Sequence, residues 1–135
     1  MGCPIIWKSQ LQTEIVLRST VSEYTGLSYA LRDVIPLMNL LKEMKKRSFQ
    51  VTAEKAKVHC RVFEDNSGAL EMATVHKYRP RTKHLNVKLH HFREYVESGK
   101  ISIHKIDTTQ QVADYLTKLL EVTTFERLRK KIMGW

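Results

Sequence analysis

The chain has 135 residues, 42% of them hydrophobic, which is enough for one domain with a modest core. No segment approaches the roughly 18 consecutive apolar residues of a membrane span, so no membrane partner is expected. Lysine and arginine number 23 against 14 acidic residues, and this net charge of +9 favours a polyanionic partner such as nucleic acid. Cys3 and Cys60 lack metal-type spacing and predict reduced thiols inside a cell.

The first part of the chain predicts two short strands and one long helix. Ile5–Ser9 and Glu14–Arg18 have strand character and flank a polar turn. From about Val21 to Lys46, apolar residues recur at three- and four-residue spacing, which predicts a helix with one buried face. Pro36 falls inside this pattern and is expected to kink or interrupt the helix.

The rest of the chain alternates predicted strands and helices. Val58–Phe63 is the clearest strand, and Ser67–Thr74 is a short helix expected to be capped by Asn66 or Ser67. The order of elements predicts an α/β layered domain with helices packed against a small sheet. The later elements are a helix from about Thr82 to Glu97 ended by Gly99, a strand at Ile101–Ile106, and helices at Thr109–Leu119 and Thr123–Met133.

A basic segment from His76 to His84 combines cations with an aromatic ring and a rigid proline, and it has no helical or strand period. This composition favours contact with a nucleic-acid backbone, although solvated basic side chains are the alternative. The residues expected to make the contacts are Lys77, Tyr78, Arg79, Arg81 and Lys83.

Three carboxylates stand at the edges of predicted elements: Glu23 at a helix start, Asp65 at a strand end and Asp114 in a late helix. Such oxygen ligands suit Mg²⁺, and two ions of this kind can hold the attacking and leaving oxygens of a phosphodiester displacement. Each carboxylate also has a structural alternative. Glu23 completes a capping box with Thr20, Asp65 is a candidate N-cap or turn acid, and Asp114 is a candidate solvated helix acid.

Four other polar residues, one glutamate and three histidines, are not expected to bind a metal ion. Glu64 is expected to point to the strand face opposite Asp65. A structural or phosphate-contacting role is expected for His84, His90 and His91, because no cysteine or carboxylate completes a zinc site at the usual spacing.

Six motifs in this order resemble the RNase H domain of copia-type retrotransposon Pol polyproteins, which also contain reverse transcriptase. The resemblance covers nearly the whole chain, from about Pro4 to Trp135. The motifs are Pro4–Gln12, Leu17–Tyr24, Phe63–Ser67, Arg81–Val87, His90–Glu94 and Val112–Lys118.

The resemblance implies an RNase H-like layered fold that is incomplete, with residues 1–135 forming one partial domain that lacks the first two strands. It implies Glu23, Asp65 and Asp114 as metal-binding, catalytic residues that use Mg²⁺ or Mn²⁺ to hydrolyse the RNA strand of RNA–DNA hybrids. A further ligand, an Asp on the first strand, has no candidate here, so the truncated chain is expected to cut little or nothing. Val58–Phe63 is then expected to have an open strand edge.

The implied partners are an RNA–DNA hybrid or other nucleic acid and the remainder of the Pol polyprotein. The implied location is intracellular, either in a cytoplasmic retrotransposon particle or in the nucleus. The alternative function is that of a non-catalytic, basic nucleic-acid-binding remnant.

Overall fold

The chain folds into two compact units, which are described separately. The sheet unit comprises Val16–Lys105, and the terminal unit comprises Met1–Ile15 together with Ile106–Trp135. This computed structural model describes residues 4–10, 12, 18–47, 57–75 and 90–134.

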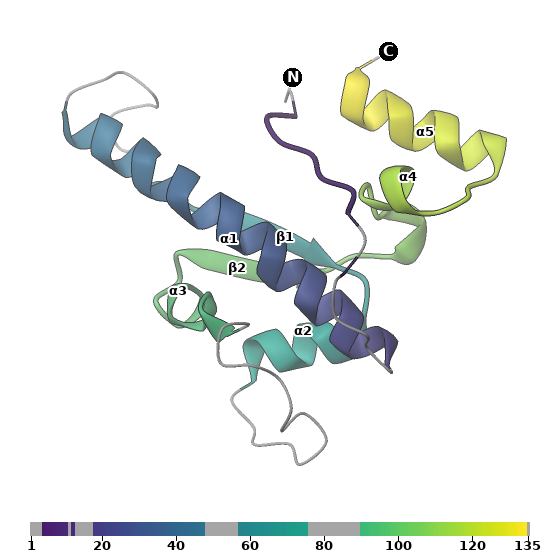
Figure 1. Cartoon of the computed structure of the whole chain (residues 1–135). Coiled ribbons are helices and arrows are strands. Elements are labelled where there is room, and N and C mark those ends of the chain that lie inside the picture. Colours follow the sequence, from purple (N-terminus) through teal and green to yellow (C-terminus); the bar gives the residue numbers. More distant parts are fainter. Residues whose placement is uncertain (1–3, 11, 13–17, 48–56, 76–89, 135) are drawn as a thin grey trace. The chain divides into compact units, whose positions relative to one another are not determined.

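The sheet unit contains two parallel strands, β1 (Cys60–Glu64) and β2 (Ile101–Lys105), as Figure 1 shows. Cys60 is opposite Ile101 in the register, so the paired side chains of the two strands lie on common faces. Within the described ranges the sheet has only these two strands, and the second edge of β1 carries no strand. The expected open edge of Val58–Phe63 stays a prediction.

The helix α1 (Ser19–Lys46) crosses the inner face of the sheet in Figure 1. Its apolar stripe is buried, as the three- and four-residue spacing predicts. The helix continues through Pro36, so the predicted interruption is wrong. The core cluster of this unit consists of Tyr24, Leu27, Leu31, Ile35, Met38, Ala69, Met72, Ala73, Phe92 and Ile101.

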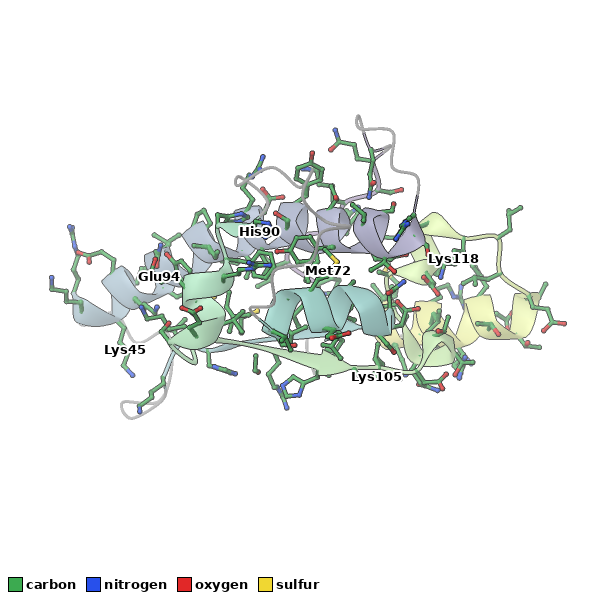
Figure 2. All side chains as sticks on the ribbon, turned by 90° about the horizontal axis from the view of Figure 1, so that it is seen from below. Lys45, Met72, His90, Glu94, Lys105 and Lys118 are labelled. Atoms are coloured by element: carbon green, nitrogen blue, oxygen red, sulfur yellow. The ribbon has the colours of Figure 1, made fainter. Side chains whose placement is uncertain are left out.

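The second helix, α2 (Ser67–Thr74), begins directly after β1 and packs against α1. Its N-cap is Asn66, whose Oδ1 accepts hydrogen bonds from the backbone N–H groups of Gly68 at 3.0 Å and Ala69 at 3.1 Å. In Figure 2, Met72 points from α2 toward α1, and its side chain is buried. The predicted helix and its cap are therefore confirmed.

Gly68 lies where α2 approaches α1. A Cβ at this position would lie 2.7 Å from Thr20 Cγ2 and 2.9 Å from Thr20 Oγ1, and the β-branched threonine has little freedom to move away. Gly68→Ala is therefore expected to lower the free energy of unfolding by about 1–3 kcal/mol, measured by urea denaturation. In a Thr20→Ala background the same substitution should be neutral or stabilising, because alanine favours the helix. Equal effects in both backgrounds would contradict this explanation.

The chain returns to the core through the segment before α3 (Arg93–Glu97). His90 lies beside α1 in Figure 2, and its Nδ1 is 2.5 Å from the Tyr24 hydroxyl. Burial raises the pKa of this tyrosine. Gly99 follows α3 with a φ of +68°, which confirms the predicted helix end. The start of that predicted helix, from Thr82 to residue 89, lies outside the described residues.

The terminal unit contains a 3₁₀ turn at Thr108–Gln110 and the helices α4 (Asp114–Thr117) and α5 (Val122–Met133). The single predicted helix at Thr109–Leu119 is therefore wrong. The Asp107 carboxylate accepts from the Thr109 N–H at 2.8 Å and starts the turn, and the extended backbone of Gln111 ends it before α4. The rings of Tyr115 and Phe125 join α4 to α5, with centroids 4.8 Å apart.

The predicted strand at Ile5–Ser9 is also wrong, since residues 4–10 form no strand pairing. The segment instead contacts α4, where Ser9 Oγ donates to the Leu116 carbonyl at 3.1 Å. Residues 14–17 of the second predicted strand lie outside the described residues, and Arg18 is the N-cap position of α1. Of the helices described, none is long and apolar enough to span a membrane.

Candidate carboxylate site

Three carboxylates of the sheet unit lie near the C-terminal end of β1. Glu64 is the last residue of β1, Asp65 follows it, and Glu23 lies in the second turn of α1. The negative charges of Glu23 and Asp65 both act on the Glu64 carboxyl. The close approach of Thr20 to Gly68 brings the starts of α1 and α2 together beside this strand end. The fold therefore gathers negative charge from two segments that are far apart in sequence.

Glu64 is the buried member of this group, with 6% of its surface exposed. Its Oε1 accepts a hydrogen bond from the Asn66 backbone N–H at 3.0 Å. Burial is the main cause that raises the pKa of Glu64. The hydrogen bond opposes the rise, and the charges of Glu23 and Asp65 add to it. The sequence signal was the alternation that places Glu64 on the same face as Cys60 and Val62.

Glu64→Gln is expected to stabilise the sheet unit at neutral pH. The folded-state pKa of Glu64 is raised, so its contribution to stability is full below the ordinary glutamate pKa and is lost as pH rises through the raised value. Glutamine carries no charge and can still accept from the Asn66 N–H. The gain in melting temperature over the parent should be small near pH 4 and increase toward neutral pH. A gain of equal size at every pH would contradict this origin.

The capping alternatives for Glu23 and Asp65 are wrong, and the alternative of Asp65 as a turn acid stays open. The helix α1 starts at Ser19 with Arg18 as the N-cap position and no side-chain cap, so Thr20 and Glu23 form no capping box. The N-cap of α2 is Asn66, so Asp65 does not cap that helix. Neither carboxylate is therefore required to start a helix, and both remain candidates for a ligand-binding role.

Asp114 belongs to the terminal unit, where it is the first residue of α4. The expected solvated position is wrong, because only 7% of the residue is exposed. Its Oδ1 and Oδ2 both lie 2.9 Å from Lys118 Nζ, one helical turn later. This ion pair offsets the cost of burying the carboxylate.

The sheet unit thus holds Glu23 and Asp65, and the convergence of Asp114 with them stays a prediction. Within the ranges that the structure describes, no three His, Cys, Asp or Glu side chains form a group that could hold a metal ion. The predicted nucleic-acid contacts at Lys77, Tyr78, Arg79, Arg81 and Lys83 lie outside the described residues.

Two nearby carboxylates still fit one class of cation. Mg²⁺ is commonly bound by one or two protein carboxylates, with water and substrate phosphates as its other ligands. Burial is the main cause of the raised pKa of Glu64, and the charges of Glu23 and Asp65 add to it, so a divalent cation beside these carboxylates would offset their mutual repulsion. The arrangement therefore suits a cation that binds together with a phosphate-bearing ligand.

The chain is similar to Pol polyproteins of plant transposons. It is 31% identical over 133 residues, 98% of its length, to the retrovirus-related Pol polyprotein from transposon TNT 1-94 of Nicotiana tabacum. It is 30% identical over 129 residues, 96% of its length, to those from transposons RE1 and RE2 of Arabidopsis thaliana. The chain spans only 8–9% of the length of these relatives. No protein-family model and no solved structure matches it. Along nearly all of its length, therefore, the chain is similar to one segment of retrovirus-related Pol polyproteins from plant transposons.

Proposed function

We propose that the chain is an RNase H-type domain of a copia-type retrotransposon Pol polyprotein, and that it binds RNA–DNA hybrids together with Mg²⁺ or Mn²⁺. The observation that carries the proposal is the similarity to Pol polyproteins along 96–98% of the chain. The motif order supports the RNase H segment in particular. The grouping of Glu23 and Asp65 around the end of β1 supports a cation site there.

The proposed ligands have distinct positions in the fold. Glu23 and Asp65 would supply carboxylate oxygens from α1 and from the end of β1, and the resemblance implies the same role for Asp114, the first residue of α4. Phosphate oxygens of the hybrid and water would complete the coordination, because two or three carboxylates alone leave positions open. A bound divalent cation would supply an activated water and stabilise the charge that develops on the phosphate.

We propose that the chain binds the RNA–DNA hybrid more readily than it cuts the RNA strand. Two-ion hydrolysis needs several converging ligands, and within the described residues no three His, Cys, Asp or Glu side chains form a group that could hold a metal ion. The chain is therefore expected to cut the RNA strand little or not at all by itself. The remainder of the Pol polyprotein is its proposed partner.

The test is the affinity of the full chain for a fluorescent RNA–DNA hybrid, measured by anisotropy in Mg²⁺, in Mn²⁺ and in EDTA at constant ionic strength. The proposal expects the divalent cation to raise the affinity, and the hybrid to raise the affinity for Mn²⁺ by the same factor, because the two ligands are linked. Gel analysis of the same samples detects any cleavage. Equal hybrid affinity in all three solutions would contradict the cation site.

The second candidate is a non-catalytic nucleic-acid-binding module, which the net charge of +9 favours. In that case hybrid binding survives EDTA unchanged and falls steeply with salt, since it depends on counterion release from phosphates. The affinity for double-stranded DNA should then match that for the hybrid. A cation-dependent preference for the hybrid favours the first candidate.

A further inference from the structure

The outer face of the sheet carries two histidines that share one hydrogen-bonding partner. His59 Nε2 lies 2.9 Å from Ser102 Oγ, and His104 Nε2 lies 2.8 Å from the same oxygen. Both histidines are exposed. Two imidazole nitrogens that each reach one oxygen at hydrogen-bonding distance are also close to a position where they can share one cation.

The Gly99 carbonyl selects the tautomer of the neutral His59 ring. Its Nδ1 lies 3.1 Å from the carbonyl oxygen of Gly99. A carbonyl only accepts, so Nδ1 carries the hydrogen in the neutral ring and Nε2 presents a lone pair toward Ser102. Donation of the remaining ring N–H to a carbonyl is the usual arrangement of a histidine that binds a metal. His59 is therefore held in the tautomer and orientation of a ligand.

A change of tautomer makes His104 available as the second ligand. Ser102 has one hydroxyl hydrogen, which it donates to His59, so the neutral His104 ring donates its Nε2 hydrogen to Ser102. Moving that hydrogen to Nδ1 leaves Nε2 available for a cation. The Phe63 ring lies beside the imidazole, with centroids 5.8 Å apart, and restricts its orientation.

We propose that His59 and His104 form a binding site for a borderline divalent cation, represented by Zn²⁺, with Ser102 or water completing its coordination. Imidazole nitrogens suit zinc, nickel and copper, whereas Mg²⁺ prefers oxygen ligands, so this site is chemically distinct from the carboxylate site. Zinc–nitrogen bonds of about 2.0–2.1 Å are shorter than the hydrogen bonds to Ser102, so both rings must move toward the cation on binding.

Arg61 opposes this binding. It pairs with Ser102 in the strand register, so its guanidinium belongs to the same outer face. Its positive charge should weaken the attraction of a divalent cation, and removing that charge should tighten binding. A substitution of Arg61 should therefore raise the zinc affinity, whereas removal of a histidine ligand should lower it.

The experiment is titration of the full chain with Zn²⁺ by isothermal calorimetry, without Mg²⁺ or chelating buffer. One zinc per chain is expected, with affinity lowered about tenfold or more by His59→Ala and by His104→Ala. Arg61→Gln is expected to raise the affinity. Thermal unfolding in EDTA checks that each variant keeps the parent's fold, which is expected because both histidines are exposed.

The control variant replaces three of the other histidines, since the chain has six in all. A triple substitution of His76, His84 and His91 by alanine should leave the zinc affinity within about twofold, well below the loss from removing a ligand. The proposal is overturned if that triple variant loses the binding. It is equally overturned if His59→Ala and His104→Ala bind zinc as the parent does, or if the parent binds none.

Discussion

Replacing Asp65 by asparagine is expected to remove the cation-dependent part of hybrid affinity. The substitution keeps the size of the side chain and removes the charge that would attract a divalent cation. Loss of an outer-shell metal partner costs about 10–100-fold in affinity, and a direct ligand is expected to cost at least that much. The variant should therefore bind the hybrid in Mg²⁺ as weakly as the parent binds it in EDTA, and any Mn²⁺-dependent cleavage should disappear.

The fold is expected to survive this substitution, because the N-cap of α2 is Asn66 and not Asp65. The matched control is Glu71→Gln, which removes an exposed carboxylate from α2, the helix that follows Asp65. It lowers the negative charge of the chain by the same amount but leaves the end of β1 intact. If both variants change the affinity equally, the effect belongs to overall charge, and the proposed role of Asp65 is wrong.

The elements that the sequence predicted correctly depend on local patterns. The buried stripe of α1 follows from apolar residues at helical spacing, and the cap of α2 follows from Asn66 before a helical run. Gly99 marks a helix end because a positive φ is inexpensive only for glycine. These features need no knowledge of distant parts of the chain.

The secondary-structure predictions are wrong where contacts with distant residues, or a local cap, determine which element forms. Ile5–Ser9 has the residue types of a strand, but a strand exists only with a neighbour to pair with, and residues 4–10 have none. The helix expected at Thr109–Leu119 is divided because the Asp107 side chain closes a separate turn. Pro36 left α1 continuous, since burial of the helix face outweighs the loss of one hydrogen bond.

The candidate site was predictable only in part for the same reason. The motifs named Glu23, Asp65 and Asp114, but spacing alone could not show that Asp114 is buried beside Lys118. Strand alternation predicted that Glu64 points to the face opposite Asp65, but it could not show that this carboxylate is buried. Its burial depends on α1 and α2 covering this end of β1, which is a property of the tertiary fold.

Phe92→Ala is expected to have the largest effect on stability in the sheet unit. Phe92 is completely buried, and its ring centroid lies 5.7 Å from that of Tyr24. Truncating a buried phenylalanine typically costs about 3–5 kcal/mol, against a total stability of about 5–15 kcal/mol for a domain. The sheet unit should therefore lose a large part of its stability and unfold at a clearly lower urea concentration than the parent, as measured by far-UV circular dichroism.

Phe63→Ala is the matched control, because the same side chain on the outer face of β1 is 48% exposed. It is expected to cost no more than about 1 kcal/mol. Phe92→Ala removes the packing behind Tyr24, the neighbour of Glu23, so it should lose both stability and cation-dependent hybrid affinity. Asp65→Asn should lose only the affinity. If Phe92→Ala instead kept the parent's stability, the core assigned to α1, α2 and the sheet would be wrong. In that case, a loss of affinity without a loss of stability in Asp65→Asn would no longer support a cation site held in place by this core.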